Sequence, residues 1–214
     1  MQTPIEPVAL MRLMRLVSPA LPLGAFAYSQ GLESAVDAGW VNDADATRDW
    51  LDGLLAHAVT PLDLAILARL CDALARRDAE AFEHWNARLL AARETAELRA
   101  EDVHLGGALW RLLEGLHLDP PLPRPAGDSS FAAVFAAAGV VWGIPREPLL
   151  AGYAWCWLEN QVSAATKLVP LGQTAAQRII EALLPTLPGH VETALALDDD
   201  DIAAGLPGLA WLSA

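Results

Sequence analysis

The stretch that most constrains the fold of this sequence is an uncharged, strongly apolar run over residues 129–145. It shows no polar stripe, which a helix on the surface of a soluble domain would need. The run is shorter than the roughly 20 residues that span a membrane, and charged residues follow it directly. We therefore predict a helix that is capped by Ser129 or Ser130, ends near Trp142 and lies at the centre of a helical fold.

The rest of the chain also carries helical signals. Alanine and leucine dominate, β-branched residues are few, and no alternation of apolar and polar residues is sustained. We predict an all-α, single-domain bundle of about eight to ten helices over residues 1–214, with the apolar helix at its centre. The second expected helix begins near Phe26 to Ser29 and ends at Ala38. The others cover residues 5–17, 46–59, 61–76, 79–117, 129–142, 149–169 and 175–184.

Three of these predictions are specific enough to test in detail. In the first helix, the expected apolar face consists of Leu10, Leu13, Met14 and Val17. The second helix is expected to stop at Gly39, a residue type that suits the position after a helix. Residues 79–117 hold a helical period throughout, and the pair Gly106–Gly107 predicts either a kink or a close helix contact.

Composition limits the classes of partner. Hydrophobic residues make up 54% of the chain and charged residues 19%, and the formal net charge is −13. This charge argues against nucleic acid and anionic membrane surfaces as partners and suits a basic protein. Cys71 and Cys156 are too few for a disulfide framework. Together with the lack of a signal-peptide pattern in residues 1–17, they predict reduced, buried cysteines and a cytoplasmic protein.

The sequence lacks the common motifs of catalysis. There is no P-loop, dinucleotide-binding or nucleophile-elbow motif, and the five histidines fall singly, without the spacing of metal ligands. We therefore predict no catalytic, cofactor-binding or metal-binding residue in this chain. An all-helical enzyme with a small-molecule pocket is the alternative, because acid–base pairs can be brought together by folding alone.

A stiff apolar turn over residues 18–33 has a specified shape. It carries no charge before Glu33 and contains Pro19, Pro22, Gly24 and Gly31. Each proline fixes its own φ and favours extended geometry in the residue before it. Such a turn is either packed inside the fold or held ready for a partner.

This turn resembles the signature of the urease accessory protein F family (UreF), S-x-x-L-P-x-G-A-F-x-x-S-x-G-L-E followed by A-x-x-A-G-W-V. Residues 18–41 carry both parts. Two further blocks are similar to the family, R-E-T-A-E-L-R at residues 93–99 and K-L-V-P-L-G-Q at residues 167–173. Three blocks in the right order make the resemblance specific. The family's tail rich in His, Arg and Tyr is expected after residue 214 and is missing from this sequence.

The resemblance implies a homodimer that is not itself an enzyme. Proteins of this family bind a UreD/UreH-type accessory protein, and the pair recruits a UreG-type GTPase to apo-urease for GTP-dependent nickel insertion. Nickel and GTP would then be handled by partner proteins, with no cofactor bound by this chain. The alternative is a direct GTPase-activating protein, with Arg93 or Arg99 reaching the partner's phosphates as an arginine finger.

The motif positions are expected to form partner surfaces or the supports beneath them. These positions are Pro22, Gly24, Tyr28, Ser29, Gln30, Gly31, Glu33, Arg93, Glu94, Glu97, Leu98, Arg99, Lys167, Pro170, Gly172 and Gln173.

Four of the charged motif residues allow a local prediction. On a continuous helix Arg93 would pair with Glu97 in a solvated charged stripe. Arg99 would fall on the apolar face and need a carboxylate or carbonyl partner there, so it either locks two helices together or reaches an interface. Lys167 is either a snorkelling residue at a helix end or a charge at a partner surface.

Overall fold

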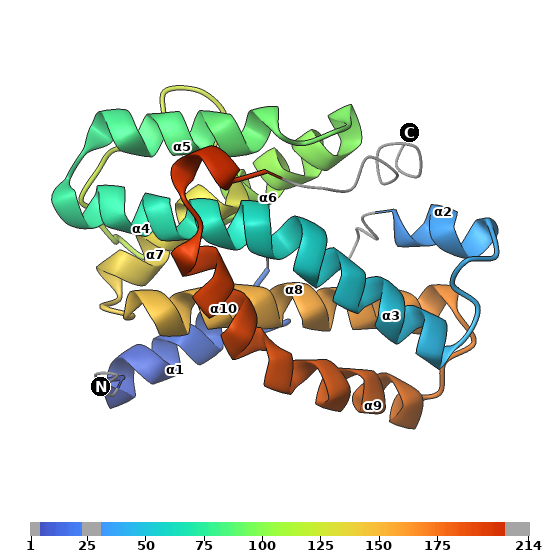
Figure 1. Ribbon diagram of the computed structural model, residues 1–214. Helices are drawn as coiled ribbons and strands as arrows, with labels where there is room; N and C mark the ends of the chain where they lie inside the picture. Colours follow the sequence, from blue (N-terminus) through green and yellow to red (C-terminus); the bar gives the residue numbers. More distant parts are fainter. Residues whose placement is uncertain (1–4, 23–30, 204–214) are drawn as a thin grey trace.

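Regular structure in the described part of the chain, residues 5–22 and 31–203 of the computed structural model, is helical throughout (Figure 1). The α-helices are α1 (Pro7–Leu16), α2 (Leu32–Asp37), α3 (Ala44–Leu54), α4 (Ala65–Arg76), α5 (Ala79–Ala91), α6 (Ala96–Gly115), α7 (Phe131–Val141), α8 (Arg146–Leu168), α9 (Gln173–Leu183) and α10 (Leu187–Ala196). A π-helical segment, η2 (Leu55–Leu64), joins α3 to α4, and η3 (Leu184–Thr186) and η4 (Asp199–Asp201) are 3₁₀ turns. The prediction of an all-α fold is confirmed.

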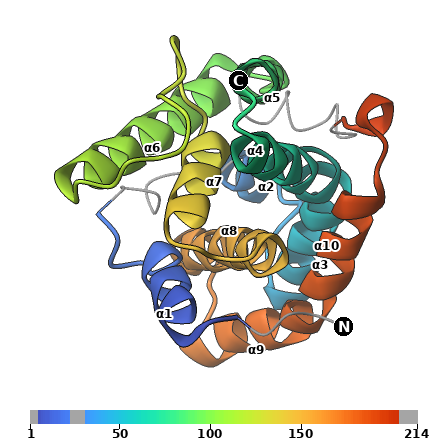
Figure 2. The same ribbon diagram turned by 90° about the vertical axis from the view of Figure 1, so that its left-hand side faces the viewer.

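The apolar run forms α7, which the other helices surround. Ser130 caps it, because the Ser130 hydroxyl accepts a hydrogen bond from the amide of Ala133 at 3.2 Å. Helix α7 packs against α4, α5, α6 and α8, and Figure 2 shows it between α4, α6 and α8. The prediction of a central apolar helix is confirmed.

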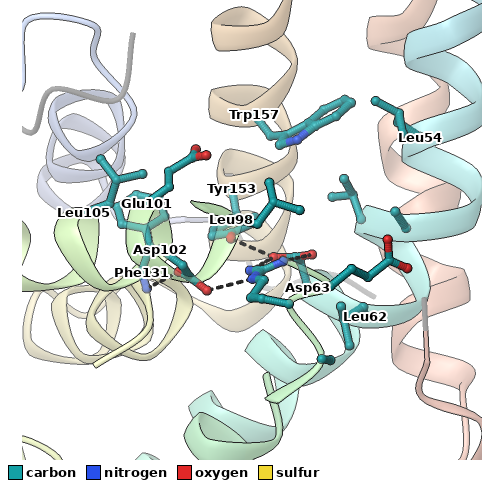
Figure 3. A pocket seen from close by; sticks show the side chains of 15 residues that line it. Leu54, Leu62, Asp63, Leu98, Glu101, Asp102, Leu105, Phe131, Tyr153 and Trp157 are labelled. Carbon is teal, nitrogen blue, oxygen red and sulfur yellow. Dashed lines mark hydrogen bonds and ion pairs between the residues drawn. The ribbon is translucent and has the colours of Figure 1, made fainter. Parts of the chain in front are cut away.

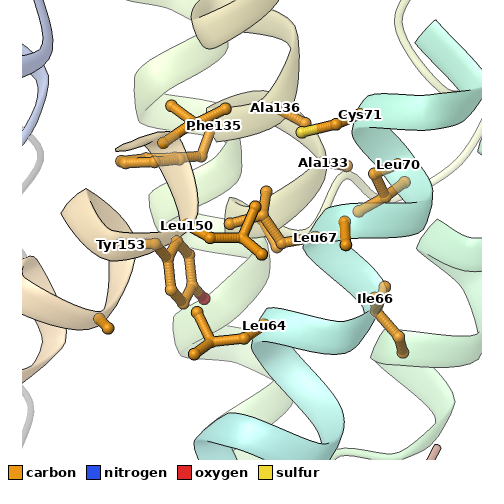
Figure 4. Packing of buried hydrophobic residues seen from close by; sticks show 14 of the residues in the cluster. Leu64, Ile66, Leu67, Leu70, Cys71, Ala133, Phe135, Ala136, Leu150 and Tyr153 are labelled. Carbon is orange, nitrogen blue, oxygen red and sulfur yellow. The ribbon is translucent and has the colours of Figure 1, made fainter. Parts of the chain in front are cut away.

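Small residues on α7 let large residues of α4 come close. Figure 4 shows Leu67, Leu70 and Cys71 of α4 facing Ala133 and Ala136 of α7, and all five side chains are buried. Burying a leucine side chain contributes roughly 1.5–3 kcal/mol to folding. The α4–α7 contact is therefore a main part of the hydrophobic core, which also includes Leu150 and Tyr153 of α8.

A continuous helical body runs from Ala44 to Arg76, so the expectation of separate helices over 46–59 and 61–76 is wrong. Pro61 lies inside it, within η2. In a regular α-helix the proline ring would clash with the carbonyl four residues earlier. The wider π-helical turn accommodates the ring, and the burial of Leu62 and Leu64 holds the segment in the core.

The same helical body is long and apolar enough to cross a membrane by length and composition alone. However, 72% of its most apolar window is buried inside the fold. Its apolar side chains are therefore mostly covered by neighbouring helices, as those of a core helix in a bundle are.

The chain leaves helical geometry between α5 and α6, so the expectation of one helix over 79–117 is wrong. Helix α5 ends at Ala91, and Thr95 caps α6 by accepting a hydrogen bond from the amide of Leu98 at 3.2 Å. A threonine side chain can offer the backbone this alternative to a continued helix. Because Arg93 lies in this break and not on the surface of a helix, its side chain can turn inward.

Gly106 marks a close contact between α6 and the start of α7. A Cβ atom placed on Gly106 would lie 2.1 Å from the carbonyl oxygen of Ser129 and 2.9 Å from the carbonyl carbon of Ser130. Helix α6 continues through this position. Of the two alternatives predicted for the glycine pair, the close contact is therefore the one observed.

The first helix differs in part from expectation, and the start of the second can be compared only from residue 31 onward. Helix α1 buries Ala9 and Leu16, whereas Leu10 and Met14, expected on its apolar face, are 44% and 63% exposed. Helix α2 begins at Leu32, directly after Gly31, whose φ of +86° a helix does not continue through. The expected start near residues 26–29 lies outside the described residues.

The end of α2 follows expectation. Gly39 has a φ of +74° and follows the helix where a stop was predicted. Of the two cysteines, Cys71 is buried as expected, but Cys156 is only half-buried, and both are free thiols.

Candidate functional site

A buried ion network centres on Arg93, in the connection between α5 and α6. Its guanidinium donates to both carboxylate oxygens of Asp63, with Nη2–Oδ1 at 2.6 Å and Nη1–Oδ2 at 3.2 Å. Its Nε donates to Oδ2 of Asp102 at 2.8 Å. The exposed fractions of these three side chains are 17%, 11% and 6% in that order. Two aspartates thus hold one guanidinium away from solvent, in the paired form that buried charges require.

The network extends into two further helices. The hydroxyl of Tyr153 on α8 donates to Oδ1 of Asp63 at 3.2 Å. Asp102 Oδ1 accepts the amide hydrogen of Phe131 at 2.6 Å, which satisfies one of the backbone donors left open at the start of α7. The interactions therefore join η2, the α5–α6 connection, α6, α7 and α8.

Aromatic packing fixes the position of Tyr153. Its ring lies 5.2 Å from that of Phe135 and 5.7 Å from that of Phe131, measured between centroids. The contact with Phe135 is edge-to-face and that with Phe131 is tilted, and both add to the apolar burial of the rings. The hydroxyl of Tyr153 is consequently aimed at Asp63 by a rigid apolar cluster.

The electrostatics of the network favour one protonation state. Burial lowers the pKa of Arg93, but the charges of Asp102 and Asp63 outweigh it and raise that pKa well above its ordinary value. Burial and the neighbouring charge of Asp63 raise the pKa of Tyr153 well above its usual range. Arg93 therefore stays charged and Tyr153 stays protonated at neutral pH, so neither suits proton transfer.

A cavity of about 120 Å³ lies against this network (Figure 3). Most of its wall is apolar, and the charged groups among the described residues that line it are four carboxylates and one guanidinium. The described residues that line it are Leu54, Ala58, Val59, Leu62, Asp63, Ala92, Arg93, Glu94, Leu98, Glu101, Asp102, Leu105, Phe131, Tyr153 and Trp157. Because Glu94 is exposed, the cavity reaches the surface beside it.

The chemistry available in the cavity is binding. The described residues of its lining include no serine, cysteine, lysine or histidine that could act as a nucleophile or base near neutral pH. Among the residues that the structure describes, no group of three or more His, Cys, Asp or Glu side chains is arranged to hold a metal ion.

The first and third motif blocks meet at one end of the fold, the right-hand end in Figure 1. A small apolar cluster packs α2 and its following loop onto the end of α8, and it consists of Leu32, Ala35, Val41, Ala164, Ala165 and Val169. Around it are exposed motif residues that we call the α2–α8 corner, namely Glu33, Lys167, Pro170, Gly172 and Gln173. Lys167 lies in the last turn of α8, where its charge favours the helix dipole.

The middle block is divided between two places. Arg93, Glu94 and Leu98 line the cavity, while Glu97 and Arg99 lie outside its lining. The expected charged stripe joining Arg93 and Glu97 is wrong, because the helix breaks at residues 92–95 and Arg93 turns inward.

Arg99 has a carboxylate and a carbonyl partner, in an exposed setting. Its side chain is 45% exposed, and it binds the carboxylate of Asp128 at 2.8 Å and the carbonyl of Leu90 at 3.3 Å. The expected kinds of partner are therefore present, but the expectation that Arg99 lies on the apolar face is wrong, because its side chain is exposed. Of the two roles considered, the contacts correspond to locking, because they tie α6 to the end of α5 and to the segment before α7.

The remaining motif positions belong to the turn before α2. Pro22 is exposed, and Gly31 is buried with its φ of +86°. Four predicted positions lie outside the described residues, namely Gly24, Tyr28, Ser29 and Gln30.

Several residues of the cavity were not predicted as site residues, chiefly Asp63, Asp102, Tyr153 and Trp157. One sequence signal was available for the first of them. Asp63 is the single acidic residue in the apolar run 58–68, and a carboxylate there must find a partner when the run is buried. Asp102 gave no such signal, because its neighbours in sequence include other charged residues.

Comparison with known proteins now identifies the family. The family model of UreF matches residues 41–184 of this chain. The urease accessory protein UreF of Chromohalobacter salexigens is 52% identical over 209 residues, which cover 98% of this chain and 91% of that protein. The urease accessory protein UreF of Marinobacter nauticus is 49% identical over 215 residues, which cover 99% of this chain and 93% of that protein.

The chain belongs to the UreF family. A third relative, the urease accessory protein UreF of Alkalilimnicola ehrlichii, is 48% identical over 217 residues, which cover 100% of this chain and 94% of that protein. The resemblance inferred from the three motif blocks is therefore confirmed.

Proposed function

We propose that this protein, a urease accessory protein by its family, acts in urease maturation as a non-enzymatic adaptor. In this role it works in the cytoplasm as a homodimer and binds a UreD/UreH-type accessory protein. The pair recruits a UreG-type GTPase to apo-urease, where nickel is inserted in a GTP-dependent step. Nickel and GTP are handled by the partner proteins, and this chain acts as the scaffold and checkpoint.

The α2–α8 corner is the observation that supports this proposal most directly. There the apolar residues of two motif blocks are buried against each other, while Glu33, Lys167 and Gln173 of the same blocks are exposed. Exposed side chains contribute little to a core, so a role in binding a partner accounts for them better than a role in folding.

A large exposed aromatic side chain adjoins the same corner. Trp40 is 60% exposed, although the next residue, Val41, is buried in the cluster between α2 and α8. Tryptophan is enriched among residues that dominate binding energy at protein interfaces. We therefore include Trp40 in the proposed partner surface.

The geometry of the two arginines disfavours the alternative of a direct GTPase-activating protein. An arginine finger must enter the partner's active site. The guanidinium of Arg93 is held by Asp63 and Asp102 in the interior, and that of Arg99 is paired with Asp128. Releasing Arg93 would leave two carboxylates buried without their cation.

Size-exclusion chromatography with light scattering tests the adaptor proposal. The chain is run alone, then with the UreD/UreH-type protein, then with the UreG-type GTPase added. We expect a dimer that joins a larger complex, and recruitment of the GTPase only when both accessory proteins are present. Failure to join either partner, in a mixture that still activates urease without this chain, would overturn the proposal.

A GTP hydrolysis assay on the same mixtures separates the two functions. The adaptor proposal predicts that Arg99→Ala leaves GTP turnover in the assembled complex unchanged. A strong acceleration of turnover by the wild-type chain that is lost in Arg99→Ala would support the GTPase-activating alternative.

A further inference from the structure

Two arginine side chains meet over the second glycine of the pair Gly106–Gly107. A Cβ atom placed on Gly107 would lie 3.4 Å from Nη1 of Arg111 and 3.9 Å from Nη2 of Arg124. We propose that Arg111 and Arg124 together bind a phosphate dianion, either inorganic phosphate or the phosphate group of a phosphorylated side chain. This inference does not depend on the adaptor role and is tested on this chain alone.

The two guanidinium groups come from different parts of the chain. Arg111 lies on α6, and Arg124 belongs to the segment between α6 and α7, which runs back along α6 (Figure 2). Both groups approach the same point on the surface of α6, where Gly107 has no side chain to separate them. Since like charges at such a separation repel each other, an anion that contacts both groups is electrostatically favoured.

The backbone on each side of the site is held in place. Arg124 lies between Pro123 and Pro125, whose rings restrict the backbone at all three positions. Nε of Arg124 also donates to the hydroxyl of the buried Ser129 at 3.4 Å, a long contact that leaves the Nη atoms for a ligand. Arg111 is fixed by the helix. Little backbone freedom is therefore lost when a ligand binds.

Neither arginine is neutralised by an acidic side chain of this protein. Both side chains are exposed, and among the described residues neither forms an ion pair with a carboxylate. The sequence outside the described ranges, residues 1–4, 23–30 and 204–214, contains no aspartate or glutamate. In a chain with 27 acidic residues and 14 lysines and arginines, two adjacent arginines without a carboxylate partner are unexpected.

Two acidic residues that are near in sequence are bound elsewhere. Glu114, one helical turn after Arg111, accepts a hydrogen bond from the indole of Trp110 at 2.9 Å. Asp128, which follows Arg124 by one turn's length of chain, is paired with Arg99 at 2.8 Å. The two guanidinium groups consequently keep their donors and their charge available for an external anion.

A phosphate dianion matches this pair in charge and in acceptors. A phosphate monoester carries a charge of about −1.5 to −2 at pH 7 and has three strong acceptor oxygens. Guanidinium groups bind such oxygens through two parallel hydrogen bonds each. A carboxylate carries one negative charge and would leave the second arginine without a full counter-charge.

The surroundings of the site favour a compact anion over an extended one. The formal net charge of the chain is −13, so a long polyanion or an anionic membrane would meet repulsion outside the two arginines. A single phosphate group contacts only the local positive charge. The ligand is therefore assigned to phosphate as an isolated group, and not to a nucleic acid or a lipid surface.

An NMR titration of the full chain at low salt and pH 7.5 tests the inference. The readout is the pair of Cζ signals of Arg111 and Arg124, assigned with Arg111→Ala and Arg124→Ala. We expect sodium phosphate to shift both signals in a saturable way. Sodium acetate at the same ionic strength is expected to bind at least about tenfold more weakly, because it carries a single charge.

Arginine variants locate the binding. Arg111→Ala and Arg124→Ala are each expected to weaken phosphate binding at least about fivefold, measured on the remaining arginine signal. Both side chains are exposed, so both variants should melt close to the wild-type temperature. Arg178→Ala is the matched control, because Arg178 is exposed on α9 and forms no ion pair among the described residues. It is expected to bind phosphate as the wild type does.

A peptide distinguishes the two sources of phosphate. The probe is acetyl-Gly-phosphoserine-Gly-amide, with the unphosphorylated peptide as its control. Tighter binding of the phosphopeptide than of inorganic phosphate would support the inference with a phosphorylated protein as the source. Tighter binding of inorganic phosphate would support it with the small anion as the source.

Four results would overturn the inference. The absence of a saturable shift with phosphate and with the phosphopeptide would show that the arginine pair binds neither. Equal binding of acetate would show that a dianion is not recognised. Equal weakening by Arg178→Ala would indicate general attraction to positive charge, and unchanged binding in both Arg111→Ala and Arg124→Ala would place the phosphate elsewhere.

Discussion

Arg93 and Arg99 lie six positions apart, but one side chain is buried and the other is half-exposed. Arg93 binds two buried carboxylates, and Arg99 forms a half-exposed pair with Asp128. Taking charges out of water costs several kcal/mol per ion unless partners compensate. Arg93, Asp63 and Asp102 therefore depend on one another, whereas Arg99 and Asp128 are each solvated without the other.

Arginine substitutions should separate these environments. We expect Arg93→Ala to lower the free energy of unfolding by about 3–5 kcal/mol, because it leaves Asp63 and Asp102 buried without their cation. Arg99→Ala removes a pair of side chains that are 45% and 51% exposed, and should cost only about 0–1 kcal/mol. Urea unfolding followed by circular dichroism measures both. Equal losses for the two variants would contradict the assignment of Arg93 to the interior.

At the scale of elements, the fold depends on two close approaches between helices. Helix α4 reaches α7 through leucines packed on alanines, and α6 reaches the start of α7 at Gly106. The second contact also carries the site, because Asp102 on the same helix caps the amide of Phe131. The spacing between α6 and α7 therefore sets the position of one wall of the cavity.

Glycine substitutions test this spacing. In Gly106→Ala the new methyl would overlap the backbone of Ser129, so α6 must move away from α7, at an expected cost of about 1–3 kcal/mol or more. Gly53→Ala is the matched control, since Gly53 is within α3 and has nothing within 4 Å of an added Cβ. We expect it to raise stability by roughly 0.5–1 kcal/mol. A thermal melt in which both variants shift in the same direction would contradict the close contact.

The parts of the fold and site that sequence could predict are those set by local patterns. The central position of α7 follows from its lack of a polar face, and the α6 contact was one of two alternatives for a glycine pair. The continuity from α3 to α4 was missed, because a proline normally breaks a helix and only burial in η2 compensates it here. The Arg93 network was missed because Asp63 lies 30 positions away and the helix breaks at Thr95.

At the scale of the whole molecule, the packing of α10 makes stability depend on pH. Nδ1 of His190 on α10 lies 2.9 Å from the hydroxyl of Thr60 on η2. Burial lowers the pKa of His190 from 6.5, against an opposing effect of Asp52. The unfolded chain therefore binds this proton more readily than the folded chain does. The stability that comes from keeping His190 neutral is fully present above the pKa of this histidine in the unfolded chain, and it is lost as pH falls below about 6.5.

Melting temperatures between pH 7.5 and 5 test this dependence. We expect His190→Gln to lose less stability on acidification than the wild type, since it removes the group that protonates on unfolding. His57→Gln changes an exposed histidine of η2, the segment that carries Thr60, and should follow the wild-type profile. Parallel profiles for His190→Gln and the wild type would rule out His190 as the source.

The α2–α8 corner is the feature of the whole molecule on which the adaptor role depends. It gathers residues that are far apart in sequence, Glu33 and residues 167–173, on one exposed end of the bundle. Lys167 is its only basic motif residue, and it lies in the last turn of α8. Arg76 offers a matched position, because it is exposed in the last turn of α4 at the opposite end of the fold.

The most direct test of the adaptor account compares binding and unfolding for Lys167→Ala and Arg76→Ala. Affinity for the UreD/UreH-type protein and the UreG-type GTPase is measured by calorimetry, and stability by thermal unfolding of the same samples. We predict that Lys167→Ala weakens assembly at least about tenfold while its unfolding temperature stays close to the wild-type value. Arg76→Ala is expected to change neither the affinity nor the unfolding temperature. A loss of stability in Lys167→Ala as large as its loss of binding, or unchanged binding, would contradict the account.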